Sequence, residues 1–455
     1  MTSLGKVKSL HFVGIGGVGM CGIAELLLNL GYRVTGSDLR DSEAVSRLRS
    51  LGAEVSIGHR SENLGRVDVV VISSAVREDN PEVAAARARR IPVIRRAEML
   101  AELMRMKHGV AVAGTHGKTT TTSMVGQVLT RAGLDPTLVI GGKVRIWGSN
   151  AKLGSGPYLV AEADEFDRSF LKLAPVIAVI TTLEAEHLDC YRDLEEIEKA
   201  FVEFANKVPF WGAVVVCLDE KGVQAIMPQL ERRVITYGLS PQASIRATDI
   251  VLKEMNSSFT VGNGSGVLGR IELKVPGRHN IKNALAAVAV ALEMEVPFDI
   301  IARALGDFSG VFRRFEIKGE KQGVLVVDDY GHHPTEIEAT LKAAKEGFNR
   351  RLIAVFQPHL YSRTRDFFRE FGSAFHQADI LLVTDIYPAR EEPIAGVSGE
   401  LVARAAVESG HRRVEYIADK ELIPEALKKI VRPGDMVITL GAGDIYRTGE
   451  RFLQL

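Results

Sequence analysis

Short apolar runs alternate with longer amphipathic segments along most of this chain. Such runs are typical of strands buried on both faces of a parallel sheet, and the segments between them repeat apolar residues at helical spacing. The first run covers residues 10–15 and leads into a helical pattern that continues to Leu30. Between residues 245 and 273 the alternation has the period of two that predicts a β-meander. The pattern therefore predicts the α/β class.

The length of 455 residues suggests about three domains, because globular domains usually contain about 100–200 residues. The pattern is interrupted near residues 106–108 and near residues 310–312. We therefore expect three α/β domains, at residues 1–107, 108–312 and 313–455.

Composition and charge exclude several classes of protein. Hydrophobic residues make up 46% of the chain and charged residues 25%, as in soluble proteins with large cores. Lys and Arg together number 57, as do Asp and Glu, so nothing in the charge points to nucleic acid or to an anionic membrane. No apolar run reaches the roughly 18–20 residues of a membrane span, and the cysteines are widely spaced. We expect a cytoplasmic protein without membrane insertion.

A glycine-containing turn in the middle of the chain has the pattern of a nucleotide-phosphate loop. The apolar run 110–113 precedes Gly114-Thr-His-Gly-Lys-Thr-Thr120, and a helical pattern follows. Glycines let backbone N–H groups approach an anion, and the helix N-terminus adds unpaired donors. Lys118 would reach the phosphates, and the Thr119 hydroxyl could bind Mg²⁺. Because Val112 stands where the strict pattern has its first glycine, an ordinary turn with a surface lysine remains the alternative. The candidate ATP-binding residues here are Gly114, Thr115, His116, Gly117, Lys118, Thr119 and Thr120.

A second glycine turn follows the first strand. Its spacing resembles that of dinucleotide-binding turns, and an acid, Asp38, stands about twenty residues further on. A glycine turn at a helix N-terminus binds a pyrophosphate, so NAD, FAD and UDP are all compatible with it. Serines also follow the strand 67–72, at the end where α/β sheets bind ligands. The candidate residues are Gly14, Gly16, Gly17, Gly19, Asp38, Ser73 and Ser74.

Two acidic segments follow strands of the central domain. Glu162 begins the run 162–167, and carboxylate oxygens are ligands that suit Mg²⁺ beside a nucleotide. His187 lies between Glu186 and Asp189, which could together hold a second metal ion. A solvated acidic turn and a structural histidine are the alternatives. Further along, Asn280 is a candidate N-cap of an alanine-rich helix.

Polar clusters end the strands of the third domain. They occupy residues 328–333, 357–363, 385–387 and 441–444. Polar residues at several strand ends predict a face that meets a ligand, although histidines of the core would be the alternative for His332, His333 and His359.

These motifs, in this order, resemble those of the Mur ligases, ATP-dependent enzymes that form the amide bonds of the peptidoglycan stem peptide. The resemblance extends over essentially the whole chain. The blocks 328–334 and 357–359 are similar to the alanine-adding members rather than to their siblings. The segments that carry the resemblance are 14–20, 36–38, 114–120, 161–165, 186–189, 279–283, 313–316, 328–334, 357–364 and 441–444.

The resemblance implies an N-terminal Rossmann-like domain that binds UDP rather than NAD, a central P-loop-type ATPase domain, and a C-terminal Rossmann-like domain that closes over the site. It implies that ATP, with Mg²⁺, phosphorylates the lactyl carboxylate of UDP-N-acetylmuramate. The amine of L-alanine would then attack the acyl phosphate and release phosphate.

The resemblance also implies roles for single residues. Lys118 would grip the phosphates, Thr119 and Glu162 would bind one Mg²⁺, and His187 a second. Arg314 would be delivered to the phosphates, and His332 would act in catalysis. The further residues implied are His279, Asn280, Asn283 and Asp329 for ATP, and Tyr330, His332, His359 and Arg363 for the amino acid.

The chain departs from the family pattern at a few positions. Thr182 stands where the family has asparagine, Glu186 replaces an aspartate, and Leu360 occupies a position that is arginine in some members. Some siblings carry a carbamylated lysine near the second metal, and neither Lys199 nor Lys207 can be placed in that role.

Three other functions stay open on the sequence. A ligase that joins a preformed peptide to the same sugar nucleotide would share most motifs. The first glycine turn alone would suit an NAD-dependent oxidoreductase, and a nucleotide-gated scaffold would need only the phosphate loop.

Overall fold

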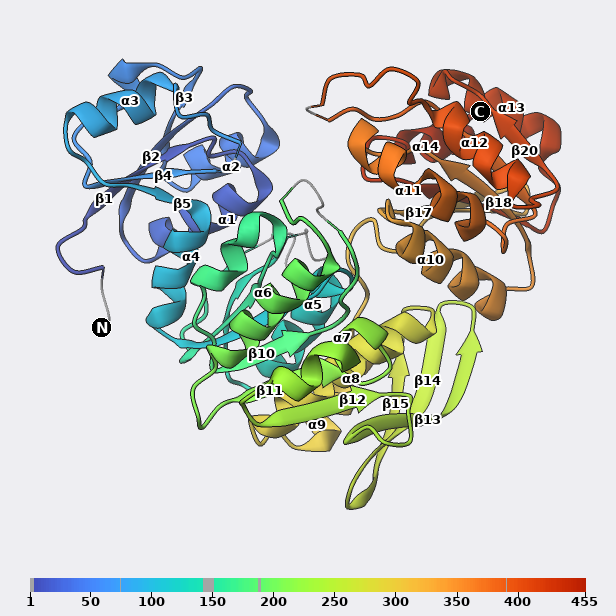
Figure 1. The fold of residues 1–455 in the computed structure, drawn as a ribbon, viewed down its shortest axis with the longest axis horizontal. Coiled ribbons are helices and arrows are strands. Elements are labelled where there is room, and N and C mark those ends of the chain that lie inside the picture. The colour runs from blue at the N-terminus through green and yellow to red at the C-terminus, as the bar shows by residue number, and fades with distance from the viewer. Residues whose placement is uncertain (1–3, 74, 142–150, 187–189, 390) are drawn as a thin grey trace. The chain divides into compact units, whose positions relative to one another are not determined.

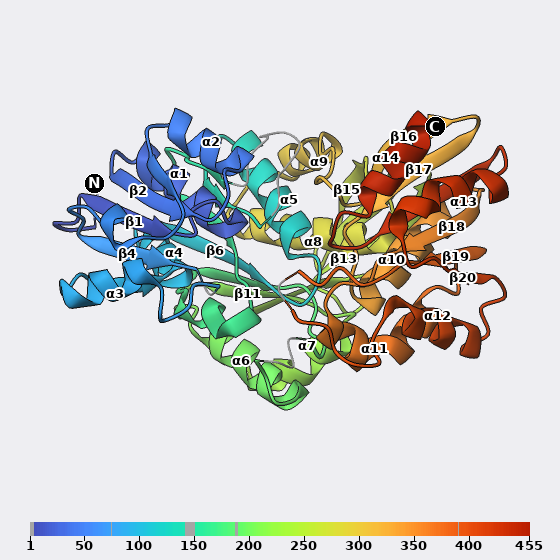
Figure 2. The same cartoon turned by 90° about the horizontal axis from the view of Figure 1, so that it is seen from above.

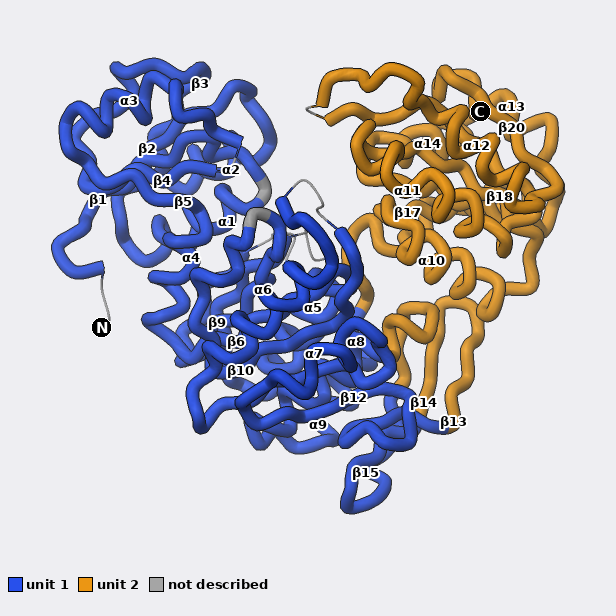
Figure 3. The backbone as a smooth tube through the Cα atoms, in the orientation of Figure 1, with its two compact units in different colours: residues 1–248, 260–271, 282–308 blue, residues 249–259, 272–281, 309–455 orange. Residues whose placement is uncertain are grey.

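The computed structural model describes residues 4–73, 75–141, 151–186, 190–389 and 391–455. Its described residues form helices and three sheets, in the α/β arrangement that the sequence predicts (Figure 1). By compactness the chain divides into two units, one of residues 1–248, 260–271 and 282–308, and the other of residues 249–259, 272–281 and 309–455 (Figure 3). His187 and Ser74 lie outside the described residues.

The first sheet is parallel throughout, with the strand order β3-β2-β1-β4-β5. Its elements are β1 (Ser9–Val13), α1 (Val18–Asn29), β2 (Arg33–Asp38), α2 (Glu43–Ser50), β3 (Glu54–Ile57), η1 (Ser61–Asn63), β4 (Val69–Ile72), α3 (Pro81–Ala88), β5 (Val93–Arg95) and α4 (Arg96–Arg105). Leu10 and Phe12 of β1 join the core with α1, whereas Val13 packs in a second cluster with Val83 of α3. Because β1 lies between β2 and β4, its carboxyl end is the point where the strand order reverses.

The second sheet has the order β15-β14-β13-β12-β11-β10-β6-β9-β7-β8. Its elements are β6 (His108–Ala113), α5 (Lys118–Arg131), β7 (Thr137–Val139), β8 (Ala151–Lys152), β9 (Tyr158–Glu162), η2 (Phe166–Lys172), β10 (Ile177–Ile180), α6 (Leu194–Asn206), β11 (Ala213–Cys217), α7 (Lys221–Ile226), η3 (Met227–Gln229), β12 (Val234–Gly238), β13 (Ile245–Lys253), β14 (Asn256–Asn263), β15 (Gly266–Leu273), α8 (Arg278–Glu293) and α9 (Phe298–Gly306). The predicted meander is confirmed, since β13, β14 and β15 are consecutive neighbours at one edge.

Strand β6 lies inside this sheet, with a parallel neighbour on each side. It pairs in parallel with β10 on one side and with β9 on the other. Its residues 110–113 are all 0% exposed. The apolar run that predicted this strand is therefore buried on both faces, as strands of parallel sheets usually are.

The third sheet has the order β16-β17-β21-β18-β19-β20, with β16 antiparallel and the others parallel. Its elements are β16 (Glu316–Lys321), β17 (Val324–Asp329), α10 (Pro334–Gly347), β18 (Arg351–Phe356), α11 (Tyr361–Ala374), β19 (Ile380–Val383), α12 (Gly399–Glu408), β20 (Val414–Tyr416), η4 (Lys420–Leu422), α13 (Ile423–Ile430), β21 (Asp435–Leu440) and α14 (Tyr446–Gln454).

Residues of β17 alternate between the two faces of this sheet. Leu325 and Val327 join the core under α10, α11 and α12, whereas Val324 and Val326 join the core under α13 and α14. Figure 2 shows α14 on one side of these strands and α11 and α12 on the other. Successive residues of a strand point to opposite faces of the sheet, so both faces carry apolar side chains and both are covered by helices. This gives the three layers of a Rossmann-like domain.

Two local features differ from the sequence analysis. The antiparallel edge strand β16 was not predicted, because its polar residues do not form an apolar run. The N-cap prediction for Asn280 is wrong: α8 begins at Arg278, and the Asn280 amide group donates to Pro276 O from inside the first turn.

Among the described residues, no helix is both long and apolar enough to cross a membrane.

Candidate active site

The predicted phosphate loop connects β6 to α5. Gly114 has φ +129° and Gly117 has φ +82°, and both values lie in the region that favours glycine. A Cβ atom at Gly114 would clash with Thr181 Oγ1, and one at Gly117 would lie 2.7 Å from Asn283 Oδ1. Helix α5 then begins at Lys118, so its N-terminal amides follow the turn directly. This strand–turn–helix arrangement is typical of sites that bind nucleotide phosphates.

The segment after β10 holds the loop in place. Thr182 O accepts a hydrogen bond from Thr115 N at 3.1 Å, and Thr182 Oγ1 accepts one from His116 N at 2.7 Å. Glu184 N in turn donates to Thr115 Oγ1 at 3.0 Å. Thr182, one of the residues that depart from the family pattern, therefore binds the loop backbone.

Lys118 forms an ion pair that the sequence analysis did not predict. Its ammonium lies 2.9 Å from both carboxylate oxygens of Glu165 and also donates to Gly114 O at 2.6 Å. Burial works against the charged lysine, but the carboxylates of Glu165, Asp164 and Glu186 more than offset it and raise the pKa of Lys118. Lys118 is thus held as a cation. Glu165 lies in the acidic run 162–167, which was the one available signal for it.

Thr119 and Glu162 bring two hard oxygen ligands together. Thr119 Oγ1 donates to Glu162 Oε2 at 3.2 Å, and Gly141 N donates to Glu162 Oε1 at 2.6 Å. Burial raises the pKa of Glu162 despite these hydrogen bonds. A hydroxyl and a partly buried carboxylate at a phosphate loop fit Mg²⁺, which prefers oxygen ligands beside a nucleotide.

The other predicted ATP residues lie on α5 and on the first turns of α8. Thr120 is buried in α5, and Thr121 Oγ1 donates to Asn283 Oδ1 at 3.2 Å. Asn283 therefore contacts both the loop and the helix that follows it. His279 and Asn280 lie one turn earlier in α8 and belong to the other compact unit.

The N-terminal glycine turn is organised by the end of β2. Gly14 N and Ile15 N both donate to Ser37 O, at 2.8 and 3.0 Å, and Gly16 N donates to Asp38 Oδ2 at 2.8 Å. Gly17 precedes α1 as its N-cap, and Gly19 lies in the first turn of that helix. Ser73 follows β4, beside Gly14. The structure thus gathers the described candidates of this turn at the carboxyl ends of three neighbouring strands.

The predicted amino-acid residues cluster at the strand ends of the third sheet. The His332 ring lies 5.4 Å from the Tyr330 ring and 5.6 Å from the His359 ring. Arg363 Nη1 lies 3.4 Å from His359 Nδ1, and His359 stacks on Tyr387 at 5.8 Å. The structure therefore brings Tyr330, His332, His359 and Arg363 together.

Arg314 and Asp329 belong to the same cluster. The Arg314 guanidinium lies 5.4 Å from the Tyr330 ring centroid and 3.3 Å from Glu336 Oε1. Asp329 accepts hydrogen bonds from Phe315 N and Gly331 N, at 2.8 and 2.7 Å. Burial raises the pKa of Asp329 to about 6, although the Arg314 charge and these hydrogen bonds act in the opposite direction. Glu336, which the motifs did not single out, also accepts from His332 N at 3.0 Å.

Leu360 has an unusual backbone conformation, with φ +70° and ψ 137°. Its N–H donates to Tyr387 O at 3.0 Å, while Tyr387 N donates to Pro358 O at 2.8 Å. This short bridge fixes the strained residue between His359 and α11. Leu360 is another of the departures from the family pattern.

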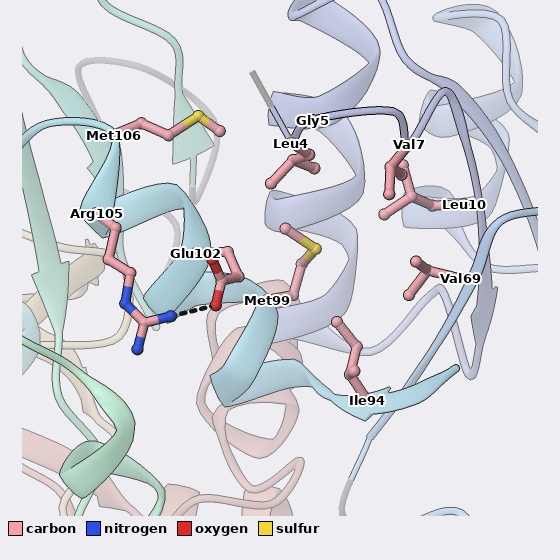
Figure 4. Close-up of a pocket in the computed structure, with 10 residues that line it drawn as sticks. All are labelled: Leu4, Gly5, Val7, Leu10, Val69, Ile94, Met99, Glu102, Arg105 and Met106. Carbon is pink, nitrogen blue, oxygen red and sulfur yellow. Dashed lines mark hydrogen bonds and ion pairs between the residues drawn. The ribbon is translucent and has the colours of Figure 1, made fainter. Parts of the chain in front are cut away.

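A pocket of about 500 Å³ in the N-terminal domain lies away from these motifs. Figure 4 shows it between the N-terminal segment and α4, with Leu10, Val69 and Met99 in its wall. Leu10 and Val69 lie at the amino ends of β1 and β4, whereas the glycine turn follows the carboxyl end of β1. Because α/β sheets bind their ligands at the carboxyl ends of strands, we place the candidate site at the motifs and not in this pocket.

The fold and the loop define a class: three-domain α/β proteins whose central domain carries a nucleotide-phosphate loop. Three sequence models of one family match the chain, and together they extend from residue 9 to residue 443. They are described as Mur ligase family, catalytic domain (residues 9–108), Mur ligase middle domain (112–291) and Mur ligase, glutamate ligase domain (313–443). The chain belongs to the Mur ligase family, which confirms the resemblance carried by the motifs.

Individual relatives match nearly the whole chain. A UDP-N-acetylmuramate–L-alanine ligase from Geobacter sp. strain M21 is 57% identical over 99% of this chain and 98% of its own length. The enzyme of that name from Syntrophotalea carbinolica is 58% identical over 98% of this chain and 97% of its own length. Among solved structures, a UDP-N-acetylmuramate-alanine ligase from Thermotoga maritima has a TM-score of 0.82 at 29% identity and covers 98% of both chains. The predicted three-domain α/β fold is thereby confirmed.

Proposed function

We propose that this protein joins L-alanine to the lactyl carboxylate of UDP-N-acetylmuramate, with ATP as the phosphoryl donor, in the synthesis of peptidoglycan precursors. The observation that carries the proposal is the identity of 57% over 99% of the chain to a ligase of that name. The geometry of the phosphate loop and the cluster of polar residues in the third domain support the same reaction.

The first step takes place at the phosphate loop. Backbone amides between Gly114 and Thr120 bind the phosphates of ATP, and Lys118 supplies a positive charge to them. Thr119 and Glu162 would hold Mg²⁺, and His187 would hold a second ion. When bound, Mg²⁺ would stabilise the negative charge of the transferred phosphoryl group. His279, Asn280, Asn283 and Asp329 are the further residues that we assign to ATP.

The sugar nucleotide binds at the N-terminal glycine turn. Gly14, Gly16, Gly17 and Gly19 leave room for its pyrophosphate at the start of α1, as glycine turns before helices do. Asp38, Ser73 and Ser74 contribute polar groups at the neighbouring strand ends. This assignment uses the turn for UDP and not for NAD.

The second step joins the amino acid to the acyl phosphate. Tyr330, His332, His359 and Arg363 bind L-alanine, and Arg314 is the cation delivered to the phosphates. A base takes one proton from the alanine ammonium, and the free amine attacks the acyl carbon. The carbon–oxygen bond to phosphate then breaks, and the phosphate leaves with the second N–H proton. His332, whose ring lies beside His359 and Tyr330, is our candidate for that base.

The three parts of the reaction correspond to domains of residues 1–107, 108–312 and 313–455. We infer that the enzyme works in the cytoplasm, where ATP is available. A murein peptide ligase from Psychrobacter arcticus has a TM-score of 0.72 at 25% identity. Because a peptide ligase shares the fold, the test must identify which amine the enzyme uses.

The test measures ADP release by the full-length protein with ATP, Mg²⁺ and UDP-N-acetylmuramate. We expect release with L-alanine and little with other amino acids or with a stem tripeptide. Turnover with the tripeptide alone would replace the proposal by a recycling ligase. Turnover that needs NAD and not ATP would replace it by an oxidoreductase.

A further inference from the structure

We propose that Glu165 sets the affinity of the ATP site by competing with the nucleotide phosphates for Lys118. Its carboxylate weakens the hold on the nucleotide and so favours release of ADP. The inference rests on the proposed use of the loop for ATP.

The Lys118 ammonium already has an acceptor for each of its N–H donors. The group has three N–H donors, and it contacts Gly114 O, Thr115 O and both oxygens of Glu165. A phosphate oxygen can be added only when one of these acceptors gives way. The two carbonyls belong to the loop backbone, which Thr182 fixes at Thr115 N and His116 N. The Glu165 carboxylate is therefore the acceptor that a phosphate replaces.

The backbone of Glu165 is anchored, so its carboxylate can give way only by rotation of the side chain. Its carbonyl oxygen accepts hydrogen bonds from Tyr191 Oη at 2.7 Å and from Arg168 N at 3.0 Å. Tyr191 is itself buried, and the Arg168 guanidinium lies over its ring at 5.1 Å. The carboxylate thus stays within the reach of one glutamate side chain from this anchored backbone.

Glu165 is only 2% exposed, so water screens its charge poorly. A buried carboxylate near a polyphosphate repels it and also shares its cation. Both effects weaken nucleotide binding in the ground state. Interactions that hold substrate and transition state equally do not raise the turnover rate, so this loss of affinity need not slow phosphoryl transfer.

A purely structural role for Glu165 predicts the opposite change in ADP affinity. If Glu165 served only to keep Lys118 in position, its neutralisation would release the lysine and weaken ADP binding. If it competes with phosphate, neutralisation tightens ADP binding. The sign of the change therefore distinguishes the two roles.

The experiment measures binding of a fluorescent ADP analogue with Mg²⁺ to the full-length protein and to Glu165→Gln. We expect Kd to fall about tenfold, which is a modest share of the repulsion between unit charges at protein dielectric constants. Dissociation of the analogue, chased with unlabelled ADP, should slow in proportion. The matched control is Asp135→Asn, which neutralises a carboxylate 2.9 Å from Lys152 in the same unit and should leave Kd unchanged.

Unchanged or weaker binding by a folded Glu165→Gln protein would overturn the inference. If the glutamine variant does not fold, the inference is tested with Glu165→Asp. The shorter acid moves the charge away from Lys118 and should also lower Kd. Failure of the unaltered protein to bind ADP would instead refute the proposed function.

Discussion

The Nε2 atom of His11 lies 3.1 Å from a carboxylate oxygen of Glu82, and neither side chain is exposed. Ser37 Oγ and Asn63 Nδ2 also donate to Glu82, both at 2.6 Å, and Arg60 N donates at 3.1 Å. Burial alone would raise the pKa of Glu82, but the hydrogen bonds from His11, Ser37 and Asn63 lower it. Because Ser37 O binds Gly14 N and Ile15 N, this buried network supports the N-terminal glycine turn.

We predict that Glu82→Ala destabilises the protein by about 3–5 kcal/mol, because it leaves the buried donors around it without an acceptor. Thermal and urea unfolding would measure the loss. Glu54→Ala is the matched control, since the exposed Arg33–Glu54 pair should contribute less than about 1 kcal/mol. Equal effects of the two variants would show that the Glu82 network does not stabilise the domain.

Lys118→Ala should reduce ADP release by several orders of magnitude, because the substitution removes a cation from the phosphates of a transferring group. Circular dichroism should show an intact fold. Lys152→Ala serves as the control, because it removes a lysine from the same compact unit that lies at Asp135 and not at the loop. Turnover close to that of the unaltered protein would indicate a scaffold that does not transfer phosphate.

The pKa of Asp329 predicts how stability depends on pH. Its folded pKa is raised to about 6 from an ordinary value of 3.8, so the folded state holds this proton more tightly than the unfolded state. Its contribution to stability is therefore fully present below about pH 4 and is lost as pH rises through 6. We expect the unfolding midpoint of Asp329→Asn, measured relative to that of the unaltered protein, to rise as the pH increases from 4.5 to 7. A constant difference across that range would contradict the prediction.

Leu360 gives a prediction about backbone strain. Glycine tolerates φ +70° without the Cβ clash that leucine meets, so Leu360→Gly should be more stable than Leu360→Ala by about 1 kcal/mol. Both variants lose the leucine side chain, so the difference between their unfolding midpoints isolates the backbone effect. An alanine variant as stable as the glycine variant would mean that the segment relaxes.

We also expect the glycine variant to have a higher KM for L-alanine, because His359 and Arg363 flank this residue.

Strand ends and glycine turns were predictable because each is encoded by a short segment. The apolar run 110–113 followed by Gly114 and Gly117 specifies a buried strand and a turn without reference to the rest of the chain. The same is true of Gly14 to Gly19 after β1. These local patterns also placed the polar clusters of the third domain at the correct end of its sheet.

Partners that are distant in sequence were not predictable. Lys118 and Glu165 are 47 positions apart, and His11 and Glu82 are 71 apart. Thr182 stood out only as a departure from a motif, and its hydrogen bonds to the loop depend on the register of β10 with β6. The positive φ of Leu360 likewise follows from the bridge to Tyr387 and not from the local sequence.

Strand β6 carries the phosphate loop with its residues 110–113 fully buried between two parallel neighbours. A mobile loop would lose conformational entropy when it closed around a polyphosphate. Here that loss already occurs on folding, because Thr182 fixes the loop backbone to the adjacent strand end. A nucleotide bound at this loop would therefore meet a backbone that is already held by hydrogen bonds to the segment after β10.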